Sequence, residues 1–377
     1  MPESRKFITA KPEPLKNILN ADFVCLLAKG LKKADRNFDE AAFQYSIINK
    51  TWKEKELKQR IRHISNAINT SLPYTFRKQV GIILKAAPAF RGLGALVFPD
   101  FIEVNGLNDI ETSLDALEIL TQYSTSEFAI RPLVTKDQKL VLKRVTQWAK
   151  HSNEHVRRLA TEGIRPRLPW ATPLPEFKKD PSKILEILDV LKNDPSEYVR
   201  RSVANNLNDI TKDHPALVLK TAKQWIGKSE NTDRLLKHAC RTLLKQGNTE
   251  ALGIFGFNSK VNASIDKFNI YPPGQTKLKI GDTLAFDFIL KNEAKKSQQL
   301  RLEYVVYFMK SNGKQSKKVF QLSSKHFEPG ETTFKRTHRF KDFTTRKHYP
   351  GEHILAISVN GVEKARKKIM LAKQPAQ

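Results

Sequence analysis

Three carboxylates in this sequence stand among arginines and aromatic residues, where a folded chain could use them for chemistry. Glu127 lies in the string EFAIRP, Glu162 in TEGIRPRLPW and Asp209 in NNLND. The tripeptide Ile-Arg-Pro occurs at Ile130 and again at Ile164, so we expect both glutamates to precede the end of a helix. A carboxylate aimed at developing positive charge can lower a reaction barrier by about 3–4 kcal/mol, and it can orient or deprotonate an attacking water.

Each carboxylate also has a purely structural interpretation. Arg158, Glu162 and Arg165 follow one another at helical spacing, and exposed pairs of this kind contribute only a few tenths of a kcal/mol. Asp209 could cap a helix end or pair with Arg201. The residue types alone leave both interpretations open.

Other reaction chemistries find little support. The sequence contains neither a G-x-x-x-x-G-K-[ST] loop nor a G-x-G-x-x-G loop, so nucleotide-driven chemistry is not expected. The string HSNEH, from His151 to His155, matches a zinc pattern that needs both histidines on one continuous helix. Asn153 instead indicates a helix start between them, and the two cysteines, Cys25 and Cys240, form no framework. We therefore expect no metal and no cofactor.

An internal repeat positions two of the carboxylates. The segment HSNEHVRRLATEGIRPRLPW is echoed by SEYVRRSVANNLND, and aligning Arg158 with Arg201 separates the copies by 201 − 158 = 43 residues. This is within the period of two-helix HEAT-type repeats. Capped amphipathic segments with short connections indicate an α-solenoid. The predicted helices lie near 12–33, 38–52, 54–71, 75–89, 111–122, 137–150, 153–165, 181–193, 196–210, 215–227 and 231–246.

After about Ser259 the pattern changes to short alternating segments separated by turn signals such as Pro272-Pro-Gly274 and Asn360-Gly361. Strands are predicted at 261–268, 283–290, 300–308, 318–322, 332–338 and 353–359. Seven or so strands in roughly 110 residues indicate an immunoglobulin-like sandwich. We expect a mainly α protein, with a HEAT-like α-solenoid in residues 1–258 and a smaller all-β immunoglobulin-like domain in 259–377.

The charge indicates a polyanionic partner. Lys and Arg number 66 against 39 Asp and Glu, a formal net charge of +27. Nucleic acid is the first choice of partner and an acidic membrane surface the second. Basic clusters such as Lys317-Lys318 and Lys364 to Lys368, expected near loops or strand ends, suggest that the sandwich contacts the same polyanion, although an inert solubilising surface is the alternative. The N-terminal MPESRKFITAK lacks an apolar signal core, so we expect a cytoplasmic protein. We also expect the protein to be a monomer and to use no membrane.

Several strings resemble a known family. HVRRLATEGIRPRLPW, YVRRSVANNLNDI and EFAIRP resemble the AlkC branch of the AlkC/AlkD alkylpurine DNA glycosylases, over roughly residues 10–256. The tail resembles the immunoglobulin-like domain found in one subset of that branch. The resemblance implies a bacterial, nucleoid-associated enzyme that hydrolyses the N-glycosidic bond of cationic alkylated bases, chiefly 3-methyladenine and 3-methylcytosine, in double-stranded DNA. It also implies that the duplex is bent and the base is not flipped into a pocket, unlike in most base-acting enzymes.

The resemblance and the residue chemistry together assign roles. A base methylated on a ring nitrogen is already a cationic leaving group, so the demand falls on the sugar, where an oxocarbenium-like charge develops. We expect Glu127, Glu162 and Asp209 to converge on the lesion, with Glu162 activating water. Trp170 is predicted to lie beside the cationic base, a contact of about 1–2 kcal/mol, with core packing as the alternative. The arginines predicted to contact flanking phosphates are Arg131, Arg158, Arg165, Arg167 and Arg201.

Two other functions stay open. A HEAT-repeat protein could bind DNA or act as a scaffold without any catalysis, with its carboxylates purely structural. A bifunctional glycosylase with lyase activity would need a nucleophilic amine, and no lysine stands out beside the three carboxylates.

Overall fold

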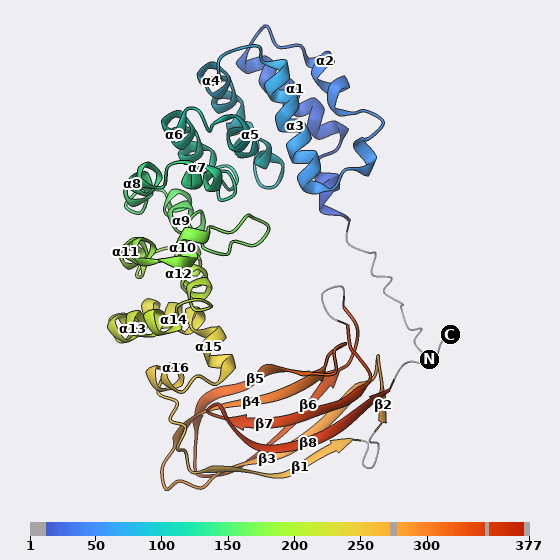
Figure 1. The fold of residues 1–377 in the computed structure, drawn as a ribbon, viewed down its shortest axis with the longest axis vertical. Helices are drawn as coiled ribbons and strands as arrows, with labels where there is room; N and C mark the ends of the chain where they lie inside the picture. Colours follow the sequence, from blue (N-terminus) through green and yellow to red (C-terminus); the bar gives the residue numbers. More distant parts are fainter. Residues whose placement is uncertain (1–12, 272–276, 344–346, 373–377) are drawn as a thin grey trace, which may run out of the picture. The chain divides into compact units, whose positions relative to one another are not determined.

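The computed structural model describes residues 13–271, 277–343 and 347–372 (Figure 1). The chain divides into two compact units, residues 1–213 and residues 214–377. The N-terminal sequence 1–12 and the expected turn at 272–274 lie outside the described residues. The expected domain boundary at 258/259 stays a prediction.

The first unit is a stack of short helices, in which α3 packs against α5, α4 against α6 and α9 against α12 (Figure 1). Side chains at many helix starts, such as Asn20, Asp39 and Asn153, accept hydrogen bonds from backbone N–H groups of the first turn. The predicted α-solenoid is thereby confirmed. Its helices are η1 Leu15–Ile18, α1 Ala21–Ala34, α2 Glu40–Ile47, η2 Trp52–Glu54, α3 Leu57–Ser71, α4 Phe76–Ala86, η3 Ala87–Ala89, η4 Gly94–Leu96, α5 Val97–Asn105, α6 Ile110–Leu120, α7 Ile130–Lys136, α8 Gln138–Trp148, α9 Glu154–Glu162, α10 Pro175–Lys179, α11 Ser182–Leu191 and α12 Glu197–Ile210.

The sequence did not predict α5, α7 and α10. Each is short and contains a proline in its first turns, where the missing N–H costs little because those donors lack intrahelical partners anyway. One expectation was therefore wrong: Ile130 begins α7, whereas Ile164 follows the end of α9 at Glu162. Glu127 consequently lies in a turn that leads into a helix.

The second unit begins with four helices and continues into two β-sheets (Figure 1). One sheet has the order β1-β3-β6 and the other β2-β8-β7-β4-β5, with a shared core that includes Phe286, Leu302 and Ile357. This confirms the all-β sandwich. Its elements are α13 Pro215–Trp225, α14 Glu230–Ala239, α15 Arg241–Gln246, α16 Thr249–Ile254, β1 Ala263–Tyr271, β2 Lys277–Lys279, β3 Thr283–Asn292, β4 Gln298–Met309, β5 Gln315–Phe327, β6 Gly330–Arg339, β7 Gly351–Val359 and β8 Val362–Ala372.

Strand β8 corrects a further expectation. Residues Lys364 to Lys368 were expected near loops or strand ends, but they lie inside β8, which pairs along its length with β7. The sequence pattern did not predict this strand because most of its residues are charged or exposed, and only Ile369 and Leu371 are fully buried in the core. Outward-facing lysines on an antiparallel sheet are compatible with one solvated face.

The last helices and the sandwich are joined by the turn between β7 and β8. Asn360 adopts a left-handed φ of 49°, which asparagine tolerates, and its amide nitrogen donates to the backbone oxygen of Asn258 at 2.7 Å. Its side-chain oxygen accepts from the backbone N–H of Arg301 at 2.7 Å. A Cβ on neighbouring Gly361 would meet Leu252 of α16 at 2.6 Å, so glycine is needed there. The chain around residue 258 is thus fastened to the sandwich.

No helix in the described part of the chain has the length and apolar character needed to cross a membrane.

Candidate active site

The three carboxylates picked out in the sequence come together in the first unit, linked by two arginines. Arg158 contacts Glu127 at 2.5 Å and Glu162 at 3.6 Å. Arg165 contacts Glu162 at 2.6 Å and Asp209 at 2.8 Å. The α9–α12 packing predicted by the repeat brings Glu162 and Asp209 together, and the turn before α7 adds Glu127. The result is one continuous row of alternating charges.

This row is buried, which rules out the exposed-pair interpretation. The exposed fractions are 9% for Glu127, 5% for Glu162 and 3% for Asp209. Burial alone would lower the pKa of Arg165, but Asp209 and Glu162 together raise it above the usual value. The row itself contains three carboxylates and two guanidiniums, and the Lys212 ammonium and the buried Arg131 guanidinium add positive charge beside it.

Hydroxyl groups that the sequence analysis missed fix the glutamates further. The Ser202 hydroxyl donates to Glu162 Oε2 at 2.5 Å, and the Thr161 hydroxyl lies 2.5 Å from Ser202 Oγ. The Thr125 hydroxyl donates to Glu127 Oε2 at 2.9 Å. Ser202 precedes Asp209 by two helical turns on α12, so the heptad spacing could have identified it.

The carboxylates differ in how fully they are occupied. Both oxygens of Glu162 have partners, as do both oxygens of Asp209, whose Oδ1 lies 3.3 Å from the ammonium of Lys212. Among the described residues, Oε1 of Glu127 accepts no hydrogen bond. Lys212 also corrects the expectation that no lysine stands out beside the carboxylates.

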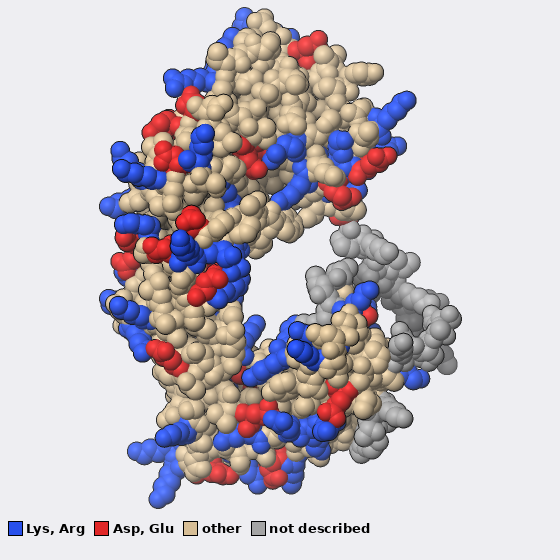
Figure 2. Space-filling model, viewed as in Figure 1, with Lys and Arg blue, Asp and Glu red and all other residues tan. Residues whose placement is uncertain are grey.

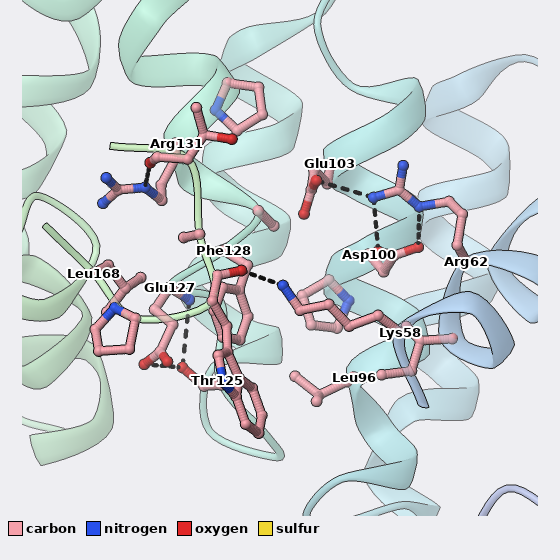
Figure 3. A pocket seen from close by; sticks show the side chains of 18 of the residues that line it. Lys58, Arg62, Leu96, Asp100, Glu103, Thr125, Glu127, Phe128, Arg131 and Leu168 are labelled. Carbon is pink, nitrogen blue, oxygen red and sulfur yellow. Dashed lines mark hydrogen bonds and ion pairs between the residues drawn. The ribbon is translucent and has the colours of Figure 1, made fainter. Parts of the chain in front are cut away.

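A cavity of about 1230 Å³ opens beside this row. Figure 3 shows Glu127, Phe128 and Leu168 toward one side and Lys58, Arg62, Asp100 and Glu103 toward the other. On that second side, burial and then the neighbouring Asp100 raise the pKa of Glu103. Glu162 also lines a smaller cavity of about 460 Å³, together with Tyr198, Arg201 and Ser202. Glu127 and Glu162 are therefore buried yet face open space.

Two of the arginines predicted to contact phosphates do not fit that role. Arg131 is 3% exposed, and its guanidinium donates to three backbone carbonyl groups of the loop that follows α9. Burial, and then the charge of Arg165, lower the pKa of Arg131 to about 10. Arg165 itself is held between two carboxylates. Both guanidiniums are therefore engaged with protein groups, which does not fit a phosphate contact.

Of the remaining predicted contact residues, Arg158 belongs to the buried row, whereas Arg167, Arg201 and Trp170 lie nearer the surface. Arg158 is partly buried against Glu127, and Arg167 pairs with Asp213 at 2.6 Å near the surface. Arg201 is exposed, and the described residues show no partner for its guanidinium. Trp170 is 69% exposed, so its core-packing interpretation is wrong.

The HSNEH string is divided as expected. His151 precedes α9, while Asn153 caps that helix and His155 lies inside it, so the histidines do not share one helix. Among residues 13–271, 277–343 and 347–372, no group of three or more His, Cys, Asp and Glu side chains is arranged to hold a metal ion.

Proteins of similar sequence and structure give the class of this site. The family model described as "DNA alkylation repair enzyme" matches residues 122–251, which include all three carboxylates. The model described as "Uncharacterised protein YhaZ, C-terminal Ig-like domain" matches residues 268–373. The buried carboxylates thus lie in a helical-repeat protein of DNA alkylation repair.

Two whole-chain relatives define its type. "Uncharacterized protein YhaZ" of Bacillus subtilis (strain 168) is 41% identical over 348 residues, which cover 92% of this chain and 96% of that protein. The structure of Pseudomonas fluorescens alkylpurine DNA glycosylase AlkC, bound to DNA containing an abasic site analog, superposes with a TM-score of 0.90 at 34% identity. It covers 96% of this chain and 100% of that one. The chain belongs to the DNA alkylation repair enzymes as an AlkC-type member with a C-terminal immunoglobulin-like domain.

Proposed function

We propose that this chain is a monofunctional DNA glycosylase that hydrolyses the N-glycosidic bond of cationic alkylated bases in duplex DNA. The expected substrates are 3-methyladenine and 3-methylcytosine. The observation that carries the proposal is the buried row of Glu127, Glu162 and Asp209, tied together by two arginines and open to a cavity. A protein that only binds DNA has no need for three carboxylates at such a place, because they repel phosphates.

The electrostatics of the row suit this reaction. An alkylated cationic base leaves as a neutral molecule, so no acid has to protonate it, and positive charge instead accumulates on the deoxyribose. The carboxylates are fixed in position before the substrate arrives, and burial reduces the screening of their field. The two arginines keep the carboxylates in place.

Within the row, we assign water activation to Glu127 rather than to Glu162, which the sequence favoured. A general base needs a carboxylate oxygen that is free to accept a proton from water. Glu127 Oε1 is such an atom within the described structure, whereas Arg165 and Ser202 occupy the two oxygens of Glu162. Glu162 and Asp209 then stabilise the charge on the sugar.

Contacts to the DNA backbone are proposed at exposed cations. Arg201, beside the smaller cavity, is the best placed of the predicted arginines. Figure 2 shows Lys and Arg side chains on the visible faces of both units, with Asp and Glu interspersed. In the sandwich, Lys364 and Lys367 of β8 are exposed, and we propose that such side chains give a second contact to the duplex. A monomer held in this way needs no base flipping, because the duplex can be bent toward the carboxylates.

The decisive experiment measures release of free methylated bases from alkylated duplex DNA by the purified protein, without added metal or nucleotide. We expect release of 3-methyladenine by the wild type. Glu127→Gln and Glu162→Gln should lose at least a hundredfold in kcat while binding DNA equally well or better. Asp213→Asn, which changes a surface carboxylate, is the control.

Two results would redirect the proposal. Binding of DNA without any release would leave the chain as a non-enzymatic binding protein with structural carboxylates. A protein–DNA adduct trapped by borohydride would instead indicate a lyase, and the lysine to replace first would be Lys212, because it lies beside Asp209.

A further inference from the structure

The loop of residues 163–174, between α9 and α10, has a strained tip. We call it the Trp170 loop. Trp170 has a φ of 65°, a left-handed conformation that bulky residues rarely adopt, and its side chain is 69% exposed. Such a conformation persists only where the surroundings impose it, and such places cluster at functional sites.

The base of the loop is held by a buried arginine. Arg131 of α7 donates to the backbone oxygens of Gly163 at 3.1 Å and Arg165 at 2.9 Å, on the first leg of the loop. It also donates to the backbone oxygen of Thr172 at 2.8 Å, on the second leg. The Arg165 side chain also binds the carboxylates Glu162 and Asp209. The Arg131 guanidinium, which holds the Arg165 backbone, therefore connects the loop to the catalytic row.

The tip of the loop is held from a different helix. The ammonium of Lys58 on α3 donates to the backbone oxygen of Trp170, which lies 112 residues further along the chain. It also lies 5.0 Å from the centre of the Phe128 ring, the residue next to Glu127. Figure 3 shows the Lys58 side chain extending across the cavity toward Phe128. Lys58 therefore connects α3 to the one residue of the loop whose backbone is strained.

We propose that Lys58 is a positioning residue for the glycosylase reaction: it holds the tip of the Trp170 loop so that the indole ring stays beside the cationic base. The inference rests on the proposed function and on the predicted contact between Trp170 and the lesion. This role accounts for the partner of Lys58: the side chain lines an open cavity, yet its ammonium is hydrogen-bonded to the Trp170 carbonyl group. A lysine that served only as a phosphate contact would not need that partner.

The contact can be tested in the protein without DNA. Trp52, Trp148 and Trp225 are buried, with exposed fractions of 6%, 1% and 3%, so the fluorescence that acrylamide can quench comes mainly from Trp170. Lys58→Met keeps an apolar chain of similar length but lacks the ammonium. We expect it to lower the anisotropy of the quenchable fluorescence, because the loop tip becomes mobile. Lys58→Arg, which keeps a donor, should restore most of the wild-type value.

The same variants test the effect on catalysis. Lys58→Met should lower kcat for 3-methyladenine release about tenfold, the size of one lost cation–π contact. Combined with Trp170→Ala, it should cost little more than Trp170→Ala alone, because Trp170→Ala already removes the ring that Lys58 positions. Lys53→Met removes a nearby exposed charge and is the matched control, which should keep both kcat and anisotropy.

Each outcome decides between the interpretations. Unchanged anisotropy in Lys58→Met would overturn the inference, as would losses that multiply in the double variant. If Lys58→Met only weakens DNA binding and lowers its salt dependence, to the same extent as Lys53→Met, then Lys58 is a plain phosphate contact. If the wild type releases no base, the proposed function fails, and the anisotropy still reports whether Lys58 holds the loop.

Discussion

Replacing Arg165 with methionine removes the side chain that joins two buried carboxylates. Arg165 Nε lies 2.8 Å from Asp209 and its Nη1 lies 2.6 Å from Glu162. Without it, Asp209 keeps only the half-exposed Lys212 as an ion-pair partner, while Glu162 keeps the more distant Arg158. Breaking a buried ion pair by removing one partner typically costs about 3–5 kcal/mol, since an uncompensated charge stays buried.

This free energy converts into a melting temperature. For a unit of this size, 1 kcal/mol lowers Tm by about 2–4 °C, so Arg165→Met should lower the Tm of the first unit by roughly 6–20 °C. Arg167→Met is the matched control, since Arg167 pairs with Asp213 at the same 2.6 Å but with side chains 33% and 25% exposed. An exposed pair contributes about 0–1 kcal/mol, so the control should melt within about 4 °C of the wild type.

The assay is thermal unfolding of both full-length variants at several pH values. A buried carboxylate without a partner favours its protonated form, so the deficit of Arg165→Met should shrink as the pH falls from about 8 to about 5. Equal melting temperatures for the two variants would refute the reasoning. The carboxylates would then be hydrated, so that leaving one unpaired costs little free energy, and their electric field at a substrate would be correspondingly weak.

Three further predictions follow from single contacts. Ser202→Ala should lower kcat about tenfold, because a hydrogen bond to the charged Glu162 is worth about 1.5–3 kcal/mol. Ser113→Ala loses an equally buried hydroxyl that binds only backbone oxygens, so it should leave kcat unchanged. The measurement is base-release kinetics at a temperature where both variants are fully folded. Arg201→Ala should weaken binding to damaged and undamaged duplex alike and reduce the slope of log K against log salt by about 1. Burial lowers the pKa of His353, so the sandwich should be fully stable above about pH 6.5 and lose stability as the pH falls below that value. The opening equilibrium of β7, measured by hydrogen exchange of its amides, should therefore be more favourable at pH 5.5 than at pH 7.5. His353→Phe should remove this pH dependence.

Much of the fold was predictable because local sequence patterns, such as the repeat spacing and the turn signals, determine it. The 43-residue spacing predicted that α9 and α12 are equivalent neighbours, and this packing is what brings Glu162 and Asp209 together. Turn signals and alternation likewise indicated most of the strands. Strand β8 was missed because its charges outweigh its few core residues, and β2 because three residues carry no periodicity.

The site was less predictable because its partners come from distant parts of the chain. Arg131 was assigned to a phosphate from its residue type and from the family resemblance, and only the tertiary structure shows that it binds the backbone of the Trp170 loop. Lys58 had no local signal at all, since its partner Trp170 lies 112 residues away. Residue type and spacing identified which groups carry charge, but not which of them are already satisfied by the protein.

That distinction bears on how a strongly basic chain can stabilise a cation. Long-range attraction to DNA needs exposed positive charge, yet the sugar at the lesion needs negative charge at short range. The chain meets both demands by burying arginines between carboxylates: Arg158 and Arg165 hold three acids together where free acids would repel one another and the DNA. The exposed cations can then bind phosphates while the buried ones organise the negative site. On this reasoning, adding surface lysines should strengthen DNA binding without raising kcat, whereas any change to the buried arginines should alter kcat first.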